Sequence, residues 1–233
     1  MREPFVGRSY ATTYRNDVAL PCQPMGRPRE HDEHTAAALL RAAERTIQDH
    51  GPDGLSVRGI ATEVGTSTRA VYSLFGSKEG LIAALGAHAF DLLRSGLDDL
   101  ATTDDPGADL IAAGLMFRRF ATEHPSLLAI GVQRSIATPL WEEQVRPAAG
   151  RALSTLKSRV TRLDDAGLLR GRTIEEATLE FHALCEGLAA LELRDPNRGW
   201  NWEQRWASAF ATQVAGFAAR PTVEPRPAPH RPR

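Results

Sequence analysis

Cysteine, lysine and long apolar runs are scarce in this chain of 233 residues. Its two cysteines, Cys22 and Cys185, lie far apart, which excludes a zinc cluster and a disulfide framework, and no other spacing calls for a metal or another cofactor. No stretch approaches the roughly 18 uninterrupted apolar residues of a membrane-spanning helix, and no apolar segment of the secretory kind opens the chain. We therefore expect a cytoplasmic protein without a membrane partner.

An excess of charge of one sign is also missing. There are 28 basic and 29 acidic residues, and the formal net charge is −1. The global basic field that often accompanies nucleic-acid binding is therefore absent, and any DNA-binding role must depend on local geometry. Lysine is so rare, with only Lys78 and Lys157 against 26 arginines, that each one is conspicuous.

Strand patterns are lacking as well. No useful run alternates apolar and polar residues, whereas helical periodicity with start and stop signals recurs along most of the chain. The expected helices cover residues 33–50, 56–64, 67–75, 77–100, a fifth from 105, a sixth from 125, 138–167 with an interruption or kink at Pro147, 173–194 and 201–219. The segments 1–30 and 220–233, rich in proline, are expected to be disordered. The predicted fold class is all-α.

Two short helices joined by a tight turn, at residues 56–64 and 67–75, have the pattern of a helix-turn-helix unit. Ala61 supplies the small residue where the helices cross, and Gly65 can adopt the left-handed conformation that the turn needs. The apolar positions expected to hold the pair on a third helix are Ile60, Val64, Val71 and Leu74. In such a unit the second helix enters the major groove of DNA, with its N-terminal residues at the base edges.

The residues expected to contact DNA surround this second helix. Its N-terminal end carries Ser67, Thr68 and Arg69, and Arg69 is the candidate for a bidentate contact with guanine. A phosphate contact or a solvated side chain is the alternative for Arg69. Tyr72 and Ser73 follow about one turn later, and the Tyr72 hydroxyl is suited to a phosphate.

Lys78 begins the next helix, where backbone N–H groups and the helix dipole already favour an anion. It is therefore the expected phosphate anchor, with an ordinary surface charge as the alternative, and Arg58 is a weaker candidate of the same kind. Residues 56–80 hold three basic and two acidic side chains. So small an excess predicts few phosphate contacts for each subunit, and specific binding then requires a dimer.

The run of residues 55–81 closely resembles the N-terminal domain of TetR/AcrR-type transcriptional repressors. Its ending, Tyr72-x-x-Phe75-x-Ser77-Lys78-Glu79, is the most specific part. The resemblance implies a helix-turn-helix domain at 31–80, a helical regulatory and dimerisation domain at 81–219, and release from DNA when a small molecule binds. Residues 117–125 and 184–192 look like a branch with a Trp-His-Gly signature, at whose place this chain has Cys185-Glu186-Gly187.

Residues 25–29, Met-Gly-Arg-Pro-Arg, resemble the short arm that precedes the first helix in this family. We expect Met25 to be the natural start. Arg27 and Arg29 would then reach phosphates or the minor groove, or remain in solvent.

The last two helices carry apolar residues at spacings of three and four. The family resemblance implies that they form the homodimer interface, and an ordinary intramolecular core is the alternative. The candidate interface residues are Leu184, Leu188, Leu191, Phe210, Val214 and Phe217.

The fifth to eighth helices are expected to enclose a ligand pocket. The expected apolar lining is Met116, Phe117, Phe120, Trp141 and Phe181, and the polar candidates are His124, Gln133, His182, Cys185 and Glu186. His182 and Glu186 lie one turn apart beside Cys185, but three ligands of mixed hardness on one turn are weak support for a metal. A pair of polar groups that orients a ligand, or plain packing, is the alternative.

These patterns predict a homodimeric, sequence-specific transcriptional regulator, a repressor released from a palindromic operator by an effector of unknown identity. Two alternatives stay open. One is a helical interaction protein with a degenerate helix-turn-helix. The other is an enzyme on a helical scaffold, for which the sequence offers no Gly-rich phosphate loop, metal-ligand spacing or nucleophile elbow.

Overall fold

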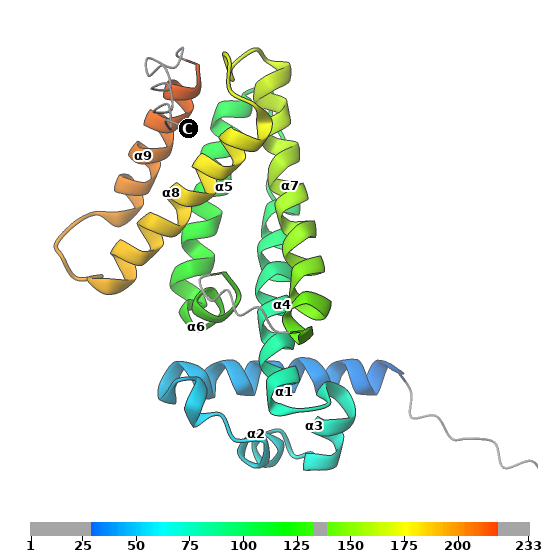
Figure 1. Cartoon of the computed structure of the whole chain (residues 1–233). Coiled ribbons are helices and arrows are strands. Elements are labelled where there is room, and N and C mark those ends of the chain that lie inside the picture. Colours follow the sequence, from blue (N-terminus) through cyan, green and yellow to red (C-terminus); the bar gives the residue numbers. More distant parts are fainter. Residues whose placement is uncertain (1–28, 133–138, 219–233) are drawn as a thin grey trace, which may run out of the picture.

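The computed structural model describes residues 29–132 and 139–218, and within these ranges it contains helices and no strand (Figure 1). The all-α prediction is confirmed. The elements are α1 (Arg29–His50), η1 (Pro52–Gly54), α2 (Val57–Val64), α3 (Thr68–Phe75), α4 (Lys78–Asp98), α5 (Pro106–Glu123), α6 (Pro125–Leu127), η2 (Leu128–Val132), η3 (Trp141–Val145), α7 (Arg146–Asp165), α8 (Ile174–Arg194) and α9 (Trp202–Phe217). Residues 1–28, Gln133 and the segment 220–233 lie outside the described residues.

Side-chain caps set most of the helix starts. The hydroxyl oxygens of Ser56, Ser67 and Ser77 each accept a hydrogen bond from the backbone N–H three residues later, at 3.3, 3.2 and 3.0 Å. Thr173 and Glu176 form a reciprocal capping box at the start of α8. Each cap satisfies a backbone donor that has no partner within its helix, which is why these starts were predictable from local sequence.

Helix boundaries differ from the prediction at several points, and α7 ends at Asp165 instead of residue 167. α1 begins at Arg29 instead of residue 33. α4 ends at Asp98 instead of residue 100, where Arg159 donates a hydrogen bond to the carbonyl of Leu97. α9 ends at Phe217 instead of residue 219.

The interruption expected at Pro147 takes the form of a π-helical turn. η3, at Trp141–Val145, directly precedes α7, and Pro147 occupies the first turn of α7. Proline lacks an N–H and its ring collides with the carbonyl four residues earlier, so a regular α-helix cannot run through this position.

The helices form two parts joined by α4. α1, α2 and α3 make a small unit at the lower end of Figure 1, and α4 rises from it into the larger part. There α4 packs along α7, and α5 packs along α9. The domain boundary expected between residues 80 and 81 falls in the first turn of α4, which is continuous across it and belongs to both parts.

Aromatic side chains fill the centre of the larger part. Trp206, Phe181, Phe210 and Phe217 are among the largest fully buried side chains, and they pack with the helices α5, α8 and α9. Within the described ranges no helix combines the length and the apolar character that a bilayer crossing requires.

Candidate DNA-binding surface and regulatory pocket

The helix-turn-helix geometry forms as the sequence predicted. Gly65 adopts φ 73° and ψ 30°, the left-handed conformation, between α2 and α3. Ile60, Ala61 and Val71 are buried, while Val64 and Leu74 are partly buried against the same core. The pair is therefore held on α1 by the expected apolar residues.

The outer face of α3 is open to solvent. Thr68, Arg69 and Ser73 are exposed, and Tyr72 is 52% exposed although it is a large aromatic residue. Ser67 is exposed too, and its hydroxyl oxygen already accepts one hydrogen bond as the cap of α3, so its O–H and its second lone pair remain for another partner. This surface offers hydrogen-bond donors and one aromatic ring to a binding partner.

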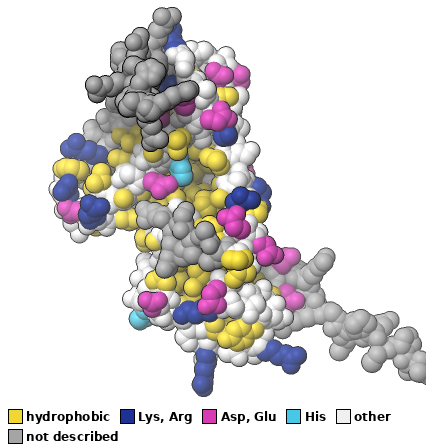
Figure 2. Space-filling model, in the orientation of Figure 1, with side chains coloured by type: hydrophobic (Ala, Val, Ile, Leu, Met, Phe, Trp, Pro, Cys, Tyr) yellow, Lys and Arg dark blue, Asp and Glu magenta, His cyan; other side chains and the backbone are white. Residues whose placement is uncertain are grey.

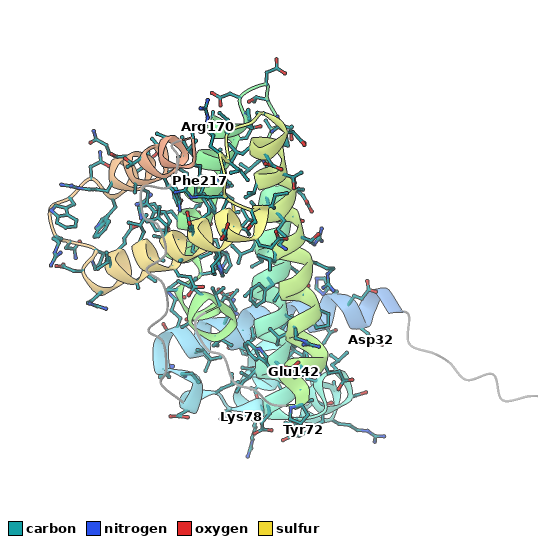
Figure 3. The ribbon with its side chains drawn as sticks, turned by 45° about the horizontal axis from the view of Figure 1, so that its top comes forward. Asp32, Tyr72, Lys78, Glu142, Arg170 and Phe217 are labelled. Carbon is teal, nitrogen blue, oxygen red and sulfur yellow. The ribbon has the colours of Figure 1, made fainter. Side chains whose placement is uncertain are left out.

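Basic groups border this face. Lys78 and Tyr72 lie at the same end of the molecule, opposite Arg170 and Phe217 (Figure 3). Arg58 is exposed in the first turn of α2. Figure 2 also has Lys or Arg side chains projecting beyond the lower end of the molecule.

The acidic residues near this face are already engaged. Glu63 forms an ion pair with Arg45 of α1, with 2.6 Å between Oε1 and Nη2. Hydrogen bonds from the Glu79 backbone N–H and from Ser77 lower the pKa of the Glu79 carboxyl and hold it at the start of α4. Arg45 therefore balances the charge of Glu63, whereas Glu79 remains ionised beside Lys78.

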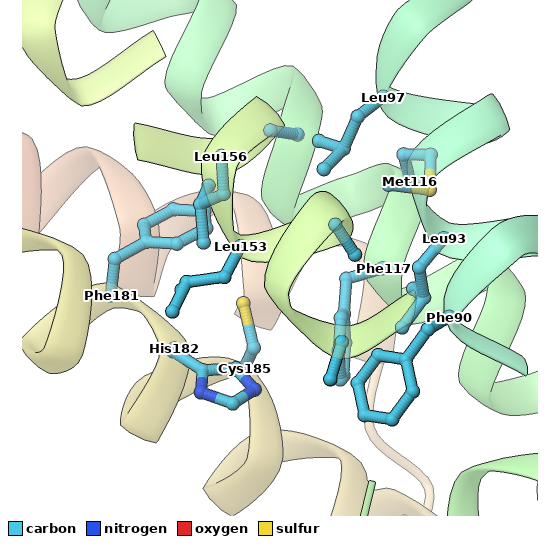
Figure 4. A pocket seen from close by; sticks show the side chains of 13 residues that line it. Phe90, Leu93, Leu97, Met116, Phe117, Leu153, Leu156, Phe181, His182 and Cys185 are labelled. Atoms are coloured by element: carbon cyan, nitrogen blue, oxygen red, sulfur yellow. The ribbon is translucent and has the colours of Figure 1, made fainter. Parts of the chain in front are cut away.

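An apolar cavity of about 70 Å³ lies between α4, α5, α7 and α8 (Figure 4). Five predicted lining residues border it: Met116, Phe117, Phe181, His182 and Cys185. The other walls come from residues that sequence reasoning missed: Phe90, Leu93, Leu97, Ala113, Ala149, Ala152, Leu153 and Leu156. The only sequence feature that could have identified these residues is helical periodicity, and that periodicity does not distinguish a cavity wall from a packed core.

Four predicted pocket residues lie outside this lining. Phe120 is buried beside Phe117, with ring centroids 6.3 Å apart. Trp141 belongs to η3, where its ring lies close to Gly86 of α4. Glu186 faces His182 one turn away, at 3.2 Å between Oε1 and Nε2.

His124, the fourth, lies at the junction of the two parts of the molecule. It follows the last residue of α5, and its Nδ1 lies 2.7 Å from Oε1 of Glu44 on α1. The pair is half-buried. It forms a direct polar link between a pocket helix and the helix-turn-helix unit.

Cys185 is buried in the wall of the cavity. Burial, reinforced by the negative charge of Glu186, raises the pKa of its thiol. The sulfur is therefore protonated at neutral pH and contributes as a small apolar group.

The predicted dimer residues divide into two groups. Leu184, Leu188 and Val214 are partly buried, and Leu191 is 48% exposed. Phe210 and Phe217 are 0% and 1% exposed, inside the protomer. For these two the structure corrects the prediction in favour of the intramolecular core, because Phe210 packs on Phe181, with ring centroids 4.9 Å apart. Leu179 of α8 is 69% exposed and received no assignment from the sequence.

Two family models match the chain. "Bacterial regulatory proteins, tetR family" matches residues 39–85, and "Tetracyclin repressor-like, C-terminal domain" matches residues 110–217. The first covers the helix-turn-helix unit, and the second covers α5 to α9. Neither match bears on the Trp-His-Gly branch, which stays a prediction.

Individual proteins of similar sequence or structure agree with these family matches. The HTH-type transcriptional regulator Mb1846 of Mycobacterium bovis is 30% identical over 109 residues, 46% of this chain and 47% of the relative, so the chain matches about half the length of that relative. A protein of unknown function from Rhodococcus sp. RHA1 superposes with a TM-score of 0.69 at 25% identity, over 79% of this chain and 96% of the other. PfmR, a TetR family transcriptional regulator from Thermus thermophilus, shares the fold with a TM-score of 0.58 at 19% identity, over 76% and 96% of the two chains.

Proposed function

The chain belongs to the TetR family of bacterial transcriptional regulators, which bind DNA and are not enzymes, and we propose that it is a homodimeric cytoplasmic repressor. Its affinity for the operator falls when a small molecule occupies its pocket. The observation that carries this proposal is the solvent-exposed face of α3, with Arg69 and Tyr72 on it and Lys78 beside it.

In the proposed complex the N-terminal end of α3 lies in the major groove. Arg69 then binds a base edge, preferably guanine, whose O6 and N7 match the two donors of a guanidinium. Lys78 and the N-terminal N–H groups of α4 bind a phosphate, and Tyr72 packs its ring against the backbone. The phosphate contacts set the register of the helix, and Arg69 reads the sequence.

A homodimer supplies the second recognition helix. Exposed leucines on α8, Leu179 and Leu191, together with the half-buried Leu184 and Leu188, support a contact through that helix. A two-fold axis there presents two copies of α3 to the same side of DNA. The operator is then palindromic, with half-sites about 34–36 Å apart or a multiple of this.

α4 provides the proposed route from ligand to DNA. Its second half carries the cavity residues Phe90, Leu93 and Leu97, and its first residue is the phosphate anchor Lys78. A ligand that displaces α4 at the cavity therefore also moves Lys78 and the neighbouring end of α3. The His124–Glu44 contact adds a second link, from α5 to α1. The ligand shifts the equilibrium only by as much as it favours the displaced arrangement.

The experiment is fluorescence-anisotropy binding of the full chain to operator DNA. The duplex is taken from the region upstream of the gene or obtained by unbiased selection from random sequences, and a scrambled duplex is measured beside it at two salt concentrations. We expect tighter binding to the operator than to the scrambled duplex at both salt concentrations. Equal binding to both duplexes that higher salt abolishes, with no sequence recovered by selection, would contradict the proposal and favour an interaction protein.

A further inference from the structure

The lining of the apolar cavity carries very little polarity. Among the described residues that border it, only His182 and Cys185 have polar side-chain atoms, and none is Asp, Glu, Lys or Arg. Burial raises the pKa of the Cys185 thiol, so this group is neutral at physiological pH. An ionised group that enters the cavity would lose its hydration without gaining a counter-charge from the lining. The cavity therefore favours a neutral ligand.

Three phenylalanine rings border the cavity, each from a different helix: Phe90 from α4, Phe117 from α5 and Phe181 from α8 (Figure 4). Two of these rings are held by aromatic residues of the core. Phe117 stacks on Trp206, with ring centroids 6.4 Å apart, and Phe181 packs on Phe210 at 4.9 Å. Trp206 and Phe210 are fully buried outside the lining, so they fix the two rings without occupying the cavity. The walls are thus preorganised aromatic surfaces, against which a further aromatic ring can pack.

The size of the cavity limits the ligand to one ring. The volume is about 70 Å³, whereas an engineered apolar cavity of about 150 Å³ binds benzene. Two lining side chains can move to enlarge it: Leu153, which is 43% exposed, and Met116, whose unbranched side chain adopts many rotamers. A second fused ring would also have to displace fully buried side chains such as Phe181.

From this lining we propose that the cavity binds a small neutral molecule built on a single aromatic ring. This ligand class rests on the proposed ligand-responsive function. The ring packs against the phenylalanine side chains, and the removal of its apolar surface from water supplies most of the affinity.

The test is titration calorimetry of the full chain at neutral pH. Benzyl alcohol is the neutral probe, and benzoate and benzylammonium carry the same ring with a negative and a positive charge. We expect benzyl alcohol to bind at least about ten-fold more tightly than either ion, because neither charge is compensated by the lining. 2-Naphthylmethanol, with a second fused ring, should bind more weakly than benzyl alcohol although it has more apolar surface.

Two variants locate the binding in this cavity. Ala149→Leu narrows the wall formed by α7 and should weaken the binding of benzyl alcohol about ten-fold. Ser154→Leu adds the same side chain at an exposed position of α7 outside the lining and should leave the affinity unchanged. Phe90→Leu removes one aromatic wall at a partly buried position. The affinity for benzyl alcohol relative to that for its saturated analogue, cyclohexylmethanol, should then fall at least about two-fold.

The proposal is overturned if benzyl alcohol does not bind, if either ion or the two-ring alcohol binds as tightly, or if folded Ala149→Leu and Phe90→Leu behave like the wild-type protein. If Ala149→Leu does not fold, the Phe90→Leu comparison decides the location. Operator binding by the same preparation is measured with and without benzyl alcohol. Specific operator binding that does not change while the cavity is occupied would contradict ligand-controlled release and leave the ligand class standing, so the two failures are distinguishable.

Discussion

The indole Nε1 of Trp206 donates a hydrogen bond to Oε2 of Glu192 at 2.7 Å, inside the protomer core. Glu192 is itself buried, and its carboxylate also accepts two hydrogen bonds from the Arg118 guanidinium. One carboxylate thus ties α5, α8 and α9 together. Since α5 and α8 also line the cavity, this contact holds the pocket walls in position.

Replacement of Glu192 by Ala should destabilise the protein by about 2–3 kcal/mol, because Arg118 and the Trp206 N–H lose their acceptor in a partly desolvated site. The measurement is the free energy of unfolding from urea titration. Glu175→Ala is the matched control. It breaks an exposed ion pair with Lys157 and should lower the free energy of unfolding far less than Glu192→Ala does. Similar values for the two variants would contradict a structural role for Glu192.

Arg69→Ala and Lys78→Ala should weaken DNA binding in different ways. Loss of Arg69 removes discrimination at one or two base positions, about 1–3 kcal/mol against the wrong base. Loss of Lys78 weakens all sequences about equally and lowers the salt dependence by roughly one phosphate contact. The check is anisotropy with single-base operator variants at several salt concentrations.

The control for both is Arg170→Ala, which removes one exposed charge at the opposite end of the molecule. It should leave operator binding unchanged. Identical behaviour of the Arg69 and Lys78 variants would show that base reading and phosphate binding are not divided between them.

Gly114→Ala should destabilise the contact between α5 and α9. A Cβ at this position would lie 2.1 Å from Cε2 of Phe210, whose ring is fully buried and has no room to move. Overpacking of this kind costs about 1–3 kcal/mol. Gly150→Ala is the contrast, since no atom lies within 4 Å of its added Cβ in α7. That variant should be neutral or more stable by up to about 1 kcal/mol, and the comparison is again made by urea titration.

Acidification should destabilise the protein partly through His88. Burial lowers the pKa of this imidazole, with a smaller contribution from Arg41 and His124, against the opposing charges of Glu44 and Asp91. The folded state thus favours neutral His88. Its contribution to stability is complete above the unfolded pKa of about 6.5 and is lost as the pH falls through the lower folded value.

His88→Gln should therefore lose less stability than the wild-type protein between pH about 7.5 and about 5. The readout is Tm at a series of pH values. A parallel shift of both proteins over this range would show that His88 is not the titrating group. Surface carboxylates are common to both proteins and cancel in the difference.

Leu179→Glu combined with Leu191→Glu should dissociate the proposed homodimer. Both side chains are exposed in the protomer, so charges placed there leave the core intact but oppose an apolar contact between α8 helices. Sedimentation velocity or light scattering reports the mass in solution. Gly150→Glu places the same charge at an exposed position of α7, where no atom lies within 4 Å of an added Cβ, and should leave the mass unchanged. A wild-type monomer would already overturn this prediction.

The lining of the pocket shows which residues could be predicted from sequence patterns and which could not. Phe117 and Phe181 were predicted because aromatic residues on the helices of the larger part commonly line such cavities, yet Phe120, equally apolar on α5, packs outside the lining. Phe90 and Leu97 on α4 received no functional assignment from the sequence. The helical period identifies the inward face of each helix, but a cavity depends on how several faces meet.

The sequence by itself determined the local elements of this protein. Ser67 and Gly65 act on backbone groups no more than a few residues away, so the helix starts, the turn and the recognition helix followed from their neighbours in the chain. The tertiary structure alone decided that Phe210 belongs to the core and that the buried guanidinium of Arg159 binds the carbonyl oxygen of Leu97. Both outcomes arise from contacts between helices that are far apart in sequence, and burial is a property of the assembled helices together.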